Sequence, residues 1–193
     1  DAVEAAKSAD AVILVLGEKD EHGEGKDKTD LRLRRASVQL INQLSDIKTP
    51  KVLVLQNGRP LVLSEVNTKV DAILETWYAG ESSGTATVNI LTGKVNPSGK
   101  SPISFPRSNG QLPIYYNRKK SNNGTYVDSN NKPLYAFGHG LSYSRFEYGN
   151  LTIESPELGK TSTQNVSLTV KNISDVAGEE IVQLYIQDVF SSV

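Results

Sequence analysis

The sequence predicts an α/β fold with a mainly parallel sheet covered on both sides, followed by the first strands of a β-sandwich. Strand-like runs at residues 11–16, 51–56 and 71–78 alternate with helical patterns, and the runs are apolar on both faces. After Phe146 the pattern changes to period-two alternation, which is typical of sandwich strands. We therefore expect one domain over residues 1–145 and a second, partial one over residues 146–193.

The first helices and strands are predicted from the spacing of apolar residues and from the glycine and proline residues that end them. Alanines recur at helical spacing over residues 1–9, and residues 11–16 then have the length and branching of a buried strand that Gly17 ends. A second helix is expected over residues 34–47, where Thr49-Pro50 stops it. Its apolar stripe consists of Val38, Ile41, Leu44 and Ile47.

The sheet continues with a strand at residues 51–56, a turn at residues 57–60 and a short strand or edge at residues 61–63. A third strand at residues 71–78 leads into a helix of small residues that Gly93 ends. Right-handed crossovers place the loops after these strands along one rim of the sheet. This is the rim at which open α/β folds bind ligands.

The second half of the chain is less regular. Residues 108–132 are polar and are expected to form a long surface loop. Residues 165–172 and 180–188 alternate as strands. Because a sandwich needs about seven strands, we expect the chain to stop within this domain.

Composition excludes several kinds of function. The 193 residues carry a net charge of −1, which argues against nucleic acid as a partner, and no apolar run approaches the length of a membrane span. Without cysteine there is no thiol catalysis, thiolate metal site or disulfide. The absence of methionine suggests a piece of a longer protein. Sequons at Asn123, Asn150, Asn165 and Asn172 are weak evidence for a secreted protein.

An acidic loop at residues 18–30 follows the first strand. It contains three glutamates and three aspartates, and Gly23 and Gly25 bracket Glu24. Flanking glycines let the backbone bend and hold a carboxyl group outward. A glutamate in such a loop can act as a general acid if burial or a neighbouring carboxylate raises its pKa. The alternative is an ordinary solvated loop.

Other chemistries find little support. Only His22 and His139 could serve a serine nucleophile, and no Gly-x-Ser-x-Gly turn follows a strand. There is no metal-ligand spacing and no phosphate-loop or dinucleotide motif, so we expect no metal and no cofactor. Glycoside hydrolysis needs two carboxyl groups. The chain offers Glu24, with Glu18 and Glu21 as rivals, but no second group on this rim that reads as a nucleophile.

Six runs, in order, resemble the second domain of glycoside hydrolase family three, which contains β-glucosidases and β-xylosidases. They are Val-Leu-Gly-Glu at 15–18, Gly-Glu-Gly-x-Asp-x-Thr-Asp-Leu at 23–31, Leu-x-Asn-Gly-Arg-Pro at 55–60, Ala-Ile-Leu-Glu-Thr-Trp-Tyr-Ala-Gly at 72–80, Asn-Pro-Ser-Gly-Lys-Ser-Pro-x-Ser-Phe-Pro-Arg at 96–107 and Pro-Leu-Tyr-x-Phe-Gly-His-Gly-Leu-Ser-Tyr at 133–143.

The resemblance implies a three-layer (αβα) sandwich whose first strand precedes residue 1, then a fibronectin type III-like domain. It also implies an amino-terminal (β/α)₈ barrel in the same protein, carrying an aspartate nucleophile that this chain lacks. Glu24 stands where members with this motif carry the general acid/base. Glu18 is expected to shape the loop or line the sugar site. For Trp77 we prefer a core position to a sugar platform, and residues 57–60 and 96–100 read as turns.

The expected function is therefore retaining hydrolysis of terminal β-glycosyl, most simply β-glucosyl, residues. The expected partners are an oligosaccharide or β-glucoside substrate and the barrel, in the periplasm or outside the cell. This segment alone should be inactive, because one carboxylate cannot run a double displacement. The alternatives are a non-catalytic carbohydrate-binding or structural module, or a flavodoxin-like ligand domain. Sequence upstream of residue 1 would discriminate them.

Overall fold

The computed structural model describes residues 1–18, 25–118, 126–159 and 161–189. The chain divides into two compact units. The first contains residues 1–87, 101–139 and 187–193, and the second contains residues 88–100 and 140–186. Each unit is described below by itself.

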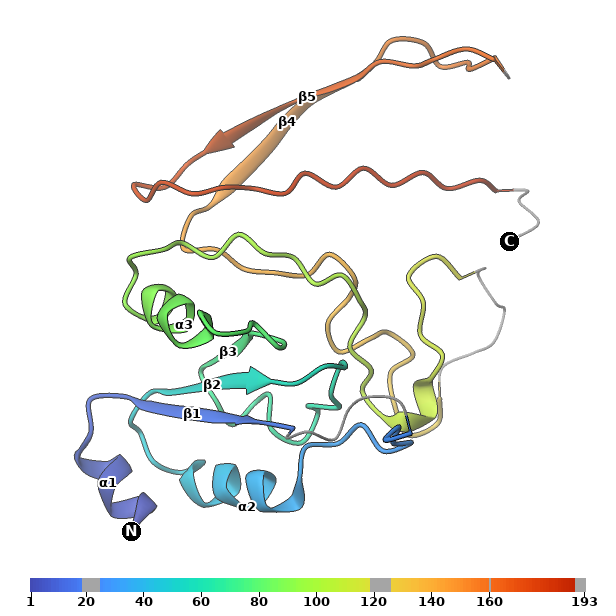
Figure 1. Ribbon diagram of the computed structural model, residues 1–193. Coiled ribbons are helices and arrows are strands. Elements are labelled where there is room, and N and C mark those ends of the chain that lie inside the picture. The colour runs from blue at the N-terminus through green and yellow to red at the C-terminus, as the bar shows by residue number, and fades with distance from the viewer. Residues whose placement is uncertain (19–24, 119–125, 160, 190–193) are drawn as a thin grey trace. The chain divides into compact units, whose positions relative to one another are not determined.

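The first unit is built on a parallel sheet of β1 (Val12–Gly17), β2 (Lys51–Gln56) and β3 (Ala72–Glu75), with β2 in the centre. The register pairs Gly17 with Gln56 and Leu55 with Glu75, so the three strands end close together. The helices α1 (Ala2–Ser8) and α2 (Arg35–Leu44) lie on the same face of the sheet (Figure 1). This arrangement confirms the predicted α/β class with a parallel sheet.

The core of this unit lies between β2 and α2. Leu53 and Leu55 of β2 are fully buried, as is Ile41 of α2. The predicted stripe on α2 is confirmed, because Leu44 is buried with Ile41 and both Val38 and Ile47 pack against the same cluster. An amphipathic helix gains most of its stability from the packing of its apolar face.

The expectation that the first strand is buried on both faces was wrong. Leu14 of β1 is buried, but Ile13 is 45% and Val15 57% exposed. The cause is position: β1 is an edge strand in the described sheet, and α1 and α2 cover only the face that carries Leu14.

Several connecting segments differ from the prediction in length. β3 stops at Glu75, shorter than residues 71–78, because Trp77 has a left-handed backbone with φ 50°. The helix α3 (Ser83–Leu91) is followed by Gly93 at φ 74°, as predicted for a helix end. The short strand or edge expected at residues 61–63 is a single bridge, Arg32 to Val62, and a second single bridge joins Phe105 to Tyr135. Within the polar loop lies a short 3₁₀ helix, η1 (Asn109–Gln111).

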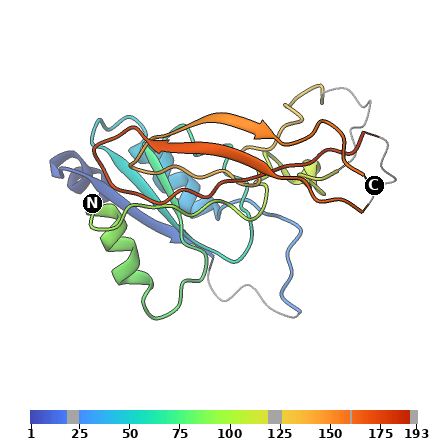
Figure 2. The same ribbon diagram turned by 90° about the horizontal axis from the view of Figure 1, so that it is seen from above.

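The second unit contains an antiparallel pair, β4 (Phe146–Ile153) and β5 (Val166–Asn172), which run side by side in Figure 2. The prediction of a strand at residues 180–188 was wrong, because these residues pair with no strand in the described part of the chain. Their apolar side chains, among them Leu184 and Ile186, are exposed. A strand needs a hydrogen-bonding neighbour, and alternation alone does not supply one.

The partly buried side-chain amide of Asn96 orders the turn at residues 96–100 of the second unit. The Asn96 Oδ1 accepts hydrogen bonds from Ser142 Oγ (2.9 Å) and from the Tyr143 amide (2.8 Å). Its Nδ2 donates to Ser144 Oγ (2.7 Å) and to the Ala177 carbonyl (2.9 Å). The motif that begins with Asn96 is therefore structural in this fold, which agrees with its interpretation as a turn.

Candidate functional site

The carboxyl ends of the three parallel strands bring together polar side chains that are far apart in sequence. Glu18 follows β1, Asn57 and Arg59 follow β2, and Glu75 ends β3. Open α/β folds place their ligand sites at such an edge. The acidic loop at residues 18–30 begins and ends at this edge, so the contacts that hold its two ends lie here.

Arg59 forms a nearly buried ion pair with Glu18. Its Nη2 lies 2.7 Å from Glu18 Oε1, and its Nε lies 3.2 and 3.3 Å from the two carboxylate oxygens. The Glu18 side chain is 5% and the Arg59 side chain 17% exposed. A guanidinium that meets a carboxylate with two nitrogens fixes the orientation of both groups. Glu18 is therefore held toward Arg59 in the interior of the rim.

The same guanidinium contacts the returning end of the acidic loop. Nη1 donates to the Lys28 carbonyl (2.8 Å) and Nη2 donates to the Asp30 carbonyl (3.2 Å). Arg59 thus joins the residue that leaves β1 to two residues at the other end of the loop. We call Arg59, Glu18 and the carbonyls of Lys28 and Asp30 the loop base.

The returning end is fixed from a second side. Asn109 Oδ1 accepts from the Leu31 amide (3.0 Å), and its Nδ2 donates to Asp30 Oδ1 (2.9 Å). Arg32 binds the same carboxylate through Nε and Nη2. Hydrogen bonds from Arg32, and then from Asn109, hold the pKa of Asp30 well below its ordinary value. Asp30 is therefore a charged anchor of the backbone, and its role is to order this end of the loop.

Gly17 lets the loop leave the sheet in close contact with β2. It has φ 152°, and a Cβ atom there would collide with the backbone of Gln56. The next amide, of Glu18, donates to the Gln56 carbonyl (3.0 Å). Only glycine allows this close approach of two backbones without displacement. The direction in which Glu18 points therefore depends on the absence of a side chain at Gly17.

Glu75 is a second carboxyl group at this rim, and it lies in a different environment. It accepts hydrogen bonds from Asn57 Nδ2 (3.2 Å) and from the Trp77 amide (3.0 Å). Burial raises its pKa from an ordinary 4.5 to about 7, although both hydrogen bonds act in the opposite direction. Asn57 is fully buried and also donates to the Arg59 carbonyl (2.9 Å), so Glu75 is connected through Asn57 to the loop base.

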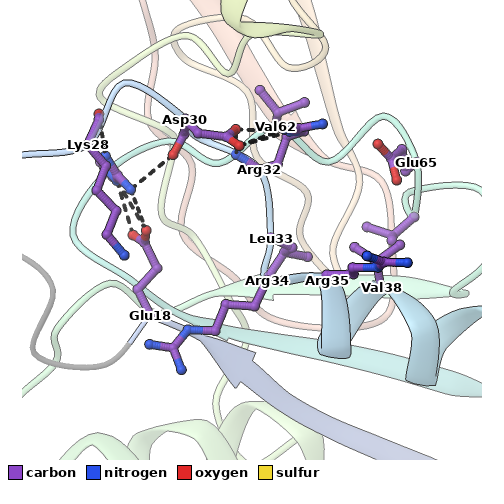
Figure 3. Close-up of a pocket in the computed structure, with 12 residues that line it drawn as sticks. Glu18, Lys28, Asp30, Arg32, Leu33, Arg34, Arg35, Val38, Val62 and Glu65 are labelled. Atoms are coloured by element: carbon purple, nitrogen blue, oxygen red, sulfur yellow. Dashed lines mark hydrogen bonds and ion pairs between the residues drawn. The ribbon is translucent and has the colours of Figure 1, made fainter.

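A cavity of about 360 Å³ lies beside the loop base. In Figure 3, Glu18, Lys28 and Asp30 lie at one side of it, and Arg35, Val38 and Glu65 lie at the other. Five cationic side chains and three carboxylates line it, which makes it a charged hollow. The cations are Lys28, Arg32, Arg34, Arg35 and Arg59, and the carboxylates are Glu18, Asp30 and Glu65.

Of the site residues predicted from sequence, some lie within the described residues and others do not. Glu24, the candidate acid/base, and its rival Glu21 lie outside the described residues. Glu18 is described and contacts Arg59. Trp77 packs against the core, with its ring centroid 5.8 Å from that of Phe105, which agrees with the core position preferred for it. No cluster of three or more metal-ligating side chains exists among the described residues.

Sequence reasoning missed Arg59, Asn57 and Glu75. Residues 57–60 were interpreted only as a turn, and Glu75 only as part of a strand. The available signal was the parallel order of the strands: if β1 and β2 end in register, then a charged residue just after one strand lies beside the residue just after the other.

Among the described helices, none is long and apolar enough to cross a bilayer.

Comparison with known proteins identifies the family. Residues 1–143 match the family model described as "Glycosyl hydrolase family 3 C-terminal domain". The whole chain is 43% identical to part of a periplasmic β-glucosidase of Salmonella typhimurium and 40% identical to part of a β-xylosidase of Formosa agariphila. In both cases it spans 27% of the relative's length, so the chain covers about a quarter of these curated relatives.

Solved structures agree with this assignment. A β-glucosidase from Listeria innocua, crystallised in complex with glucose, superposes with a TM-score of 0.92 at 39% identity. The match covers 98% of this chain and 28% of that protein. A β-glucosidase involved in saponin metabolism from intestinal bacteria superposes with a TM-score of 0.86 over the whole chain at 33% identity. The resemblance stated from six sequence motifs is confirmed: the chain belongs to glycosyl hydrolase family 3, of which it contains the C-terminal domain.

Proposed function

We propose that this chain supplies the acid/base half of the active site of a retaining, exo-acting β-glycosidase, most simply a β-glucosidase. Membership of glycosyl hydrolase family 3, whose relatives include β-glucosidases and a β-xylosidase, is the observation that carries the proposal. The structure supports it with a loop base that fixes both ends of the acidic loop at the carboxyl edge of the sheet.

The proposed reaction has two steps. An aspartate on an amino-terminal (β/α)₈ barrel of the same protein attacks the anomeric carbon, while Glu24 gives its proton to the departing glycosidic oxygen. A water molecule then attacks the glycosyl–enzyme bond, Glu24 takes a proton from that water, and the aspartate leaves as a carboxylate. Glu24 ends the cycle protonated, as it began. The nucleophile lies outside this chain, so the chain alone should not hydrolyse glycosides.

Glu18 has a different proposed role from Glu24. Its carboxylate meets the Arg59 guanidinium with two oxygens and is almost fully buried. A carboxylate in this position stabilises the loop base and is poorly placed to bind a sugar hydroxyl. Of the two roles expected from sequence, shaping the loop is therefore the one that we propose.

Two further assignments complete the proposal. The domain boundary is placed after residue 145, with a partial fibronectin type III-like domain from residue 146; β4 begins at that point. We place the protein in the periplasm or outside the cell, because the Salmonella typhimurium relative is a periplasmic β-glucosidase.

The decisive experiment replaces Glu24 by Ala in the full-length protein. Glycosides with poor leaving groups should lose about 10²–10⁴-fold in kcat/KM, because their departing oxygen needs a proton. Activated aryl glucosides should lose much less in kcat/KM, and azide should rescue turnover by replacing the base-activated water. Parallel assays with aryl glucosides and aryl xylosides show which of the two sugars the enzyme hydrolyses faster. Equal losses on good and poor leaving groups, without rescue, would remove Glu24 from this role.

A further inference from the structure

We infer that Arg59 is a positioning residue for catalysis, which sets the place of the acid/base loop by holding its two ends together. The inference rests on the proposed function, because it requires that this loop carries the acid/base. It assigns a role to the Asn-Gly-Arg-Pro turn, which sequence reasoning treated as structural only.

One side chain, that of Arg59, reaches both ends of the loop. The Arg59 guanidinium contacts Glu18 at one end of the loop, and Lys28 and Asp30 at the other. The two contacts with carbonyls are to the backbone, so they fix the course of the chain irrespective of the side chains at residues 28 and 30. Loss of the Arg59 guanidinium would therefore release the returning end of the loop, at Lys28 and Asp30, from the Glu18 end that the sheet holds.

Arg59 is itself held in place by buried contacts. Its carbonyl accepts a hydrogen bond from Asn57 Nδ2, and Asn57 is fully buried and also bonded to Glu75. Its guanidinium is mostly buried against Glu18, where a charge-assisted contact is stronger than at the surface. The loop base is thus tied to the ends of β2 and β3, which are rigid parts of the sheet.

Lysine cannot replace Arg59, because the contacts need donors in several fixed directions. Arg59 uses all three guanidinium nitrogens: Nε and Nη2 for Glu18, Nη2 for the Asp30 carbonyl and Nη1 for the Lys28 carbonyl. An ammonium group keeps the charge but cannot present donors in three fixed directions in one plane. A displacement of about 1 Å in a catalytic group can lower a rate by about a hundredfold.

The test uses the full-length protein and compares Arg59→Met, Arg59→Lys and Glu24→Ala, alone and combined. Both Arg59 variants should lose about ten- to a hundredfold in kcat/KM on poor leaving groups and clearly less on activated aryl glucosides. When Glu24 is already Ala, adding Arg59→Lys should change kcat/KM less than about twofold, because a residue that acts only through Glu24 has nothing left to position.

Lys51→Met is the matched control. Lys51 is also a buried cation that donates to two backbone carbonyls, of Ile47 (2.6 Å) and Thr49 (3.0 Å), but it lies at the opposite end of β2. Its replacement should lower the melting temperature without any dependence on the leaving group. This separates loss of fold stability from loss of positioning.

The outcomes are distinguishable. If Glu24→Ala shows the leaving-group dependence but the Arg59 variants do not, or if the Arg59 loss persists undiminished beside Glu24→Ala, the inference fails and the proposed function stands. If Glu24→Ala itself shows no such dependence, the proposed function fails. Should Arg59→Met not fold, Arg59→Lys, which preserves the buried charge, decides the matter. Faster amide exchange at residues 28–31 in Arg59→Lys would give independent support.

Discussion

The side-chain amide of Asn57 donates to the carboxylate of Glu75 over 3.2 Å, joining the turn after β2 to the end of β3. Neither group was expected to matter from sequence. Asn57 is fully buried and Glu75 partly buried, and Asn57 Oδ1 has no hydrogen-bond partner among the described residues. A raised pKa beside an unpaired acceptor makes this contact sensitive to protonation and to small chemical changes.

The first prediction concerns the pH dependence of stability. The folded protein retains the Glu75 proton up to a pKa of about 7, whereas the unfolded chain releases it near 4.5. The folded state therefore binds more protons between these values, and this group's contribution to stability is complete below pH 4.5 and is lost as pH rises through 7. Glu75→Gln should remove this slope, which amounts to at most on the order of 3 kcal/mol.

Urea unfolding at a series of pH values measures that slope. Glu81→Gln, which changes an exposed glutamate after the same strand, is the control and should keep the wild-type slope. A Glu75→Gln protein with an unchanged pH profile would show that the Glu75 proton is not linked to folding.

The second prediction is that Asn57→Asp destabilises the first unit by about 2–4 kcal/mol at neutral pH. The change places a carboxyl group beside Glu75 and removes the donor to the Arg59 carbonyl. Asn42→Asp is the control: Asn42 is exposed on α2 and accepts from Lys69 Nζ (2.6 Å), an interaction that aspartate keeps. Its effect should stay within about 0.5 kcal/mol. Equal denaturation midpoints for the two variants would contradict the network.

The third prediction concerns Gly17. Replacement by Ala forces a Cβ atom into the Gln56 backbone and should destabilise the protein by about 3 kcal/mol or more. Gly84→Ala, at an open position in α3, should instead be neutral or stabilising by up to about 1 kcal/mol. Thermal melts of both variants provide the comparison, and a Gly17→Ala protein as stable as Gly84→Ala would refute the close contact.

The fourth prediction concerns the partly buried Asn96 amide of the second unit. Asn96→Ala removes four hydrogen bonds and should destabilise this unit by about 2–3 kcal/mol, with faster exchange of the Tyr143 amide. Ser98→Ala, in the same turn, removes only a long contact of 3.5 Å to Glu179 and should have little effect. Similar Tyr143 exchange in the two variants would argue that Asn96 is dispensable.

The regular elements of the first unit could be predicted because local pattern and burial agree there. The run at residues 51–56 is apolar on both faces, and β2 has these bounds with Leu53, Val54 and Leu55 buried. The stripe on α2 follows in the same way from its spacing. Where burial depends on neighbours, the pattern fails: Ile13 and Val15 have the composition of a covered strand but lie on the exposed face of β1.

The chemistry of the rim could be predicted only in part. Carboxylates after β1 were visible in sequence, but the partner of Glu18 is an arginine 41 residues away, which only strand pairing brings near. The raised pKa of Glu75 depends on burial by segments that are distant in sequence, and no local pattern predicts that burial. Residues 180–188 show the converse, since their alternation is clear but they have no pairing neighbour in the described chain.

The fastening of residue 18 to residues 28 and 30 has a consequence for variation in this protein. Because the two anchor points are already held together, lengthening or shortening the span between them adds only a small closure entropy. Insertions, deletions or whole-segment exchanges inside the anchors should leave the sheet undisturbed. The anchors thus mark a junction at which the span between them can vary in length without rebuilding the sheet.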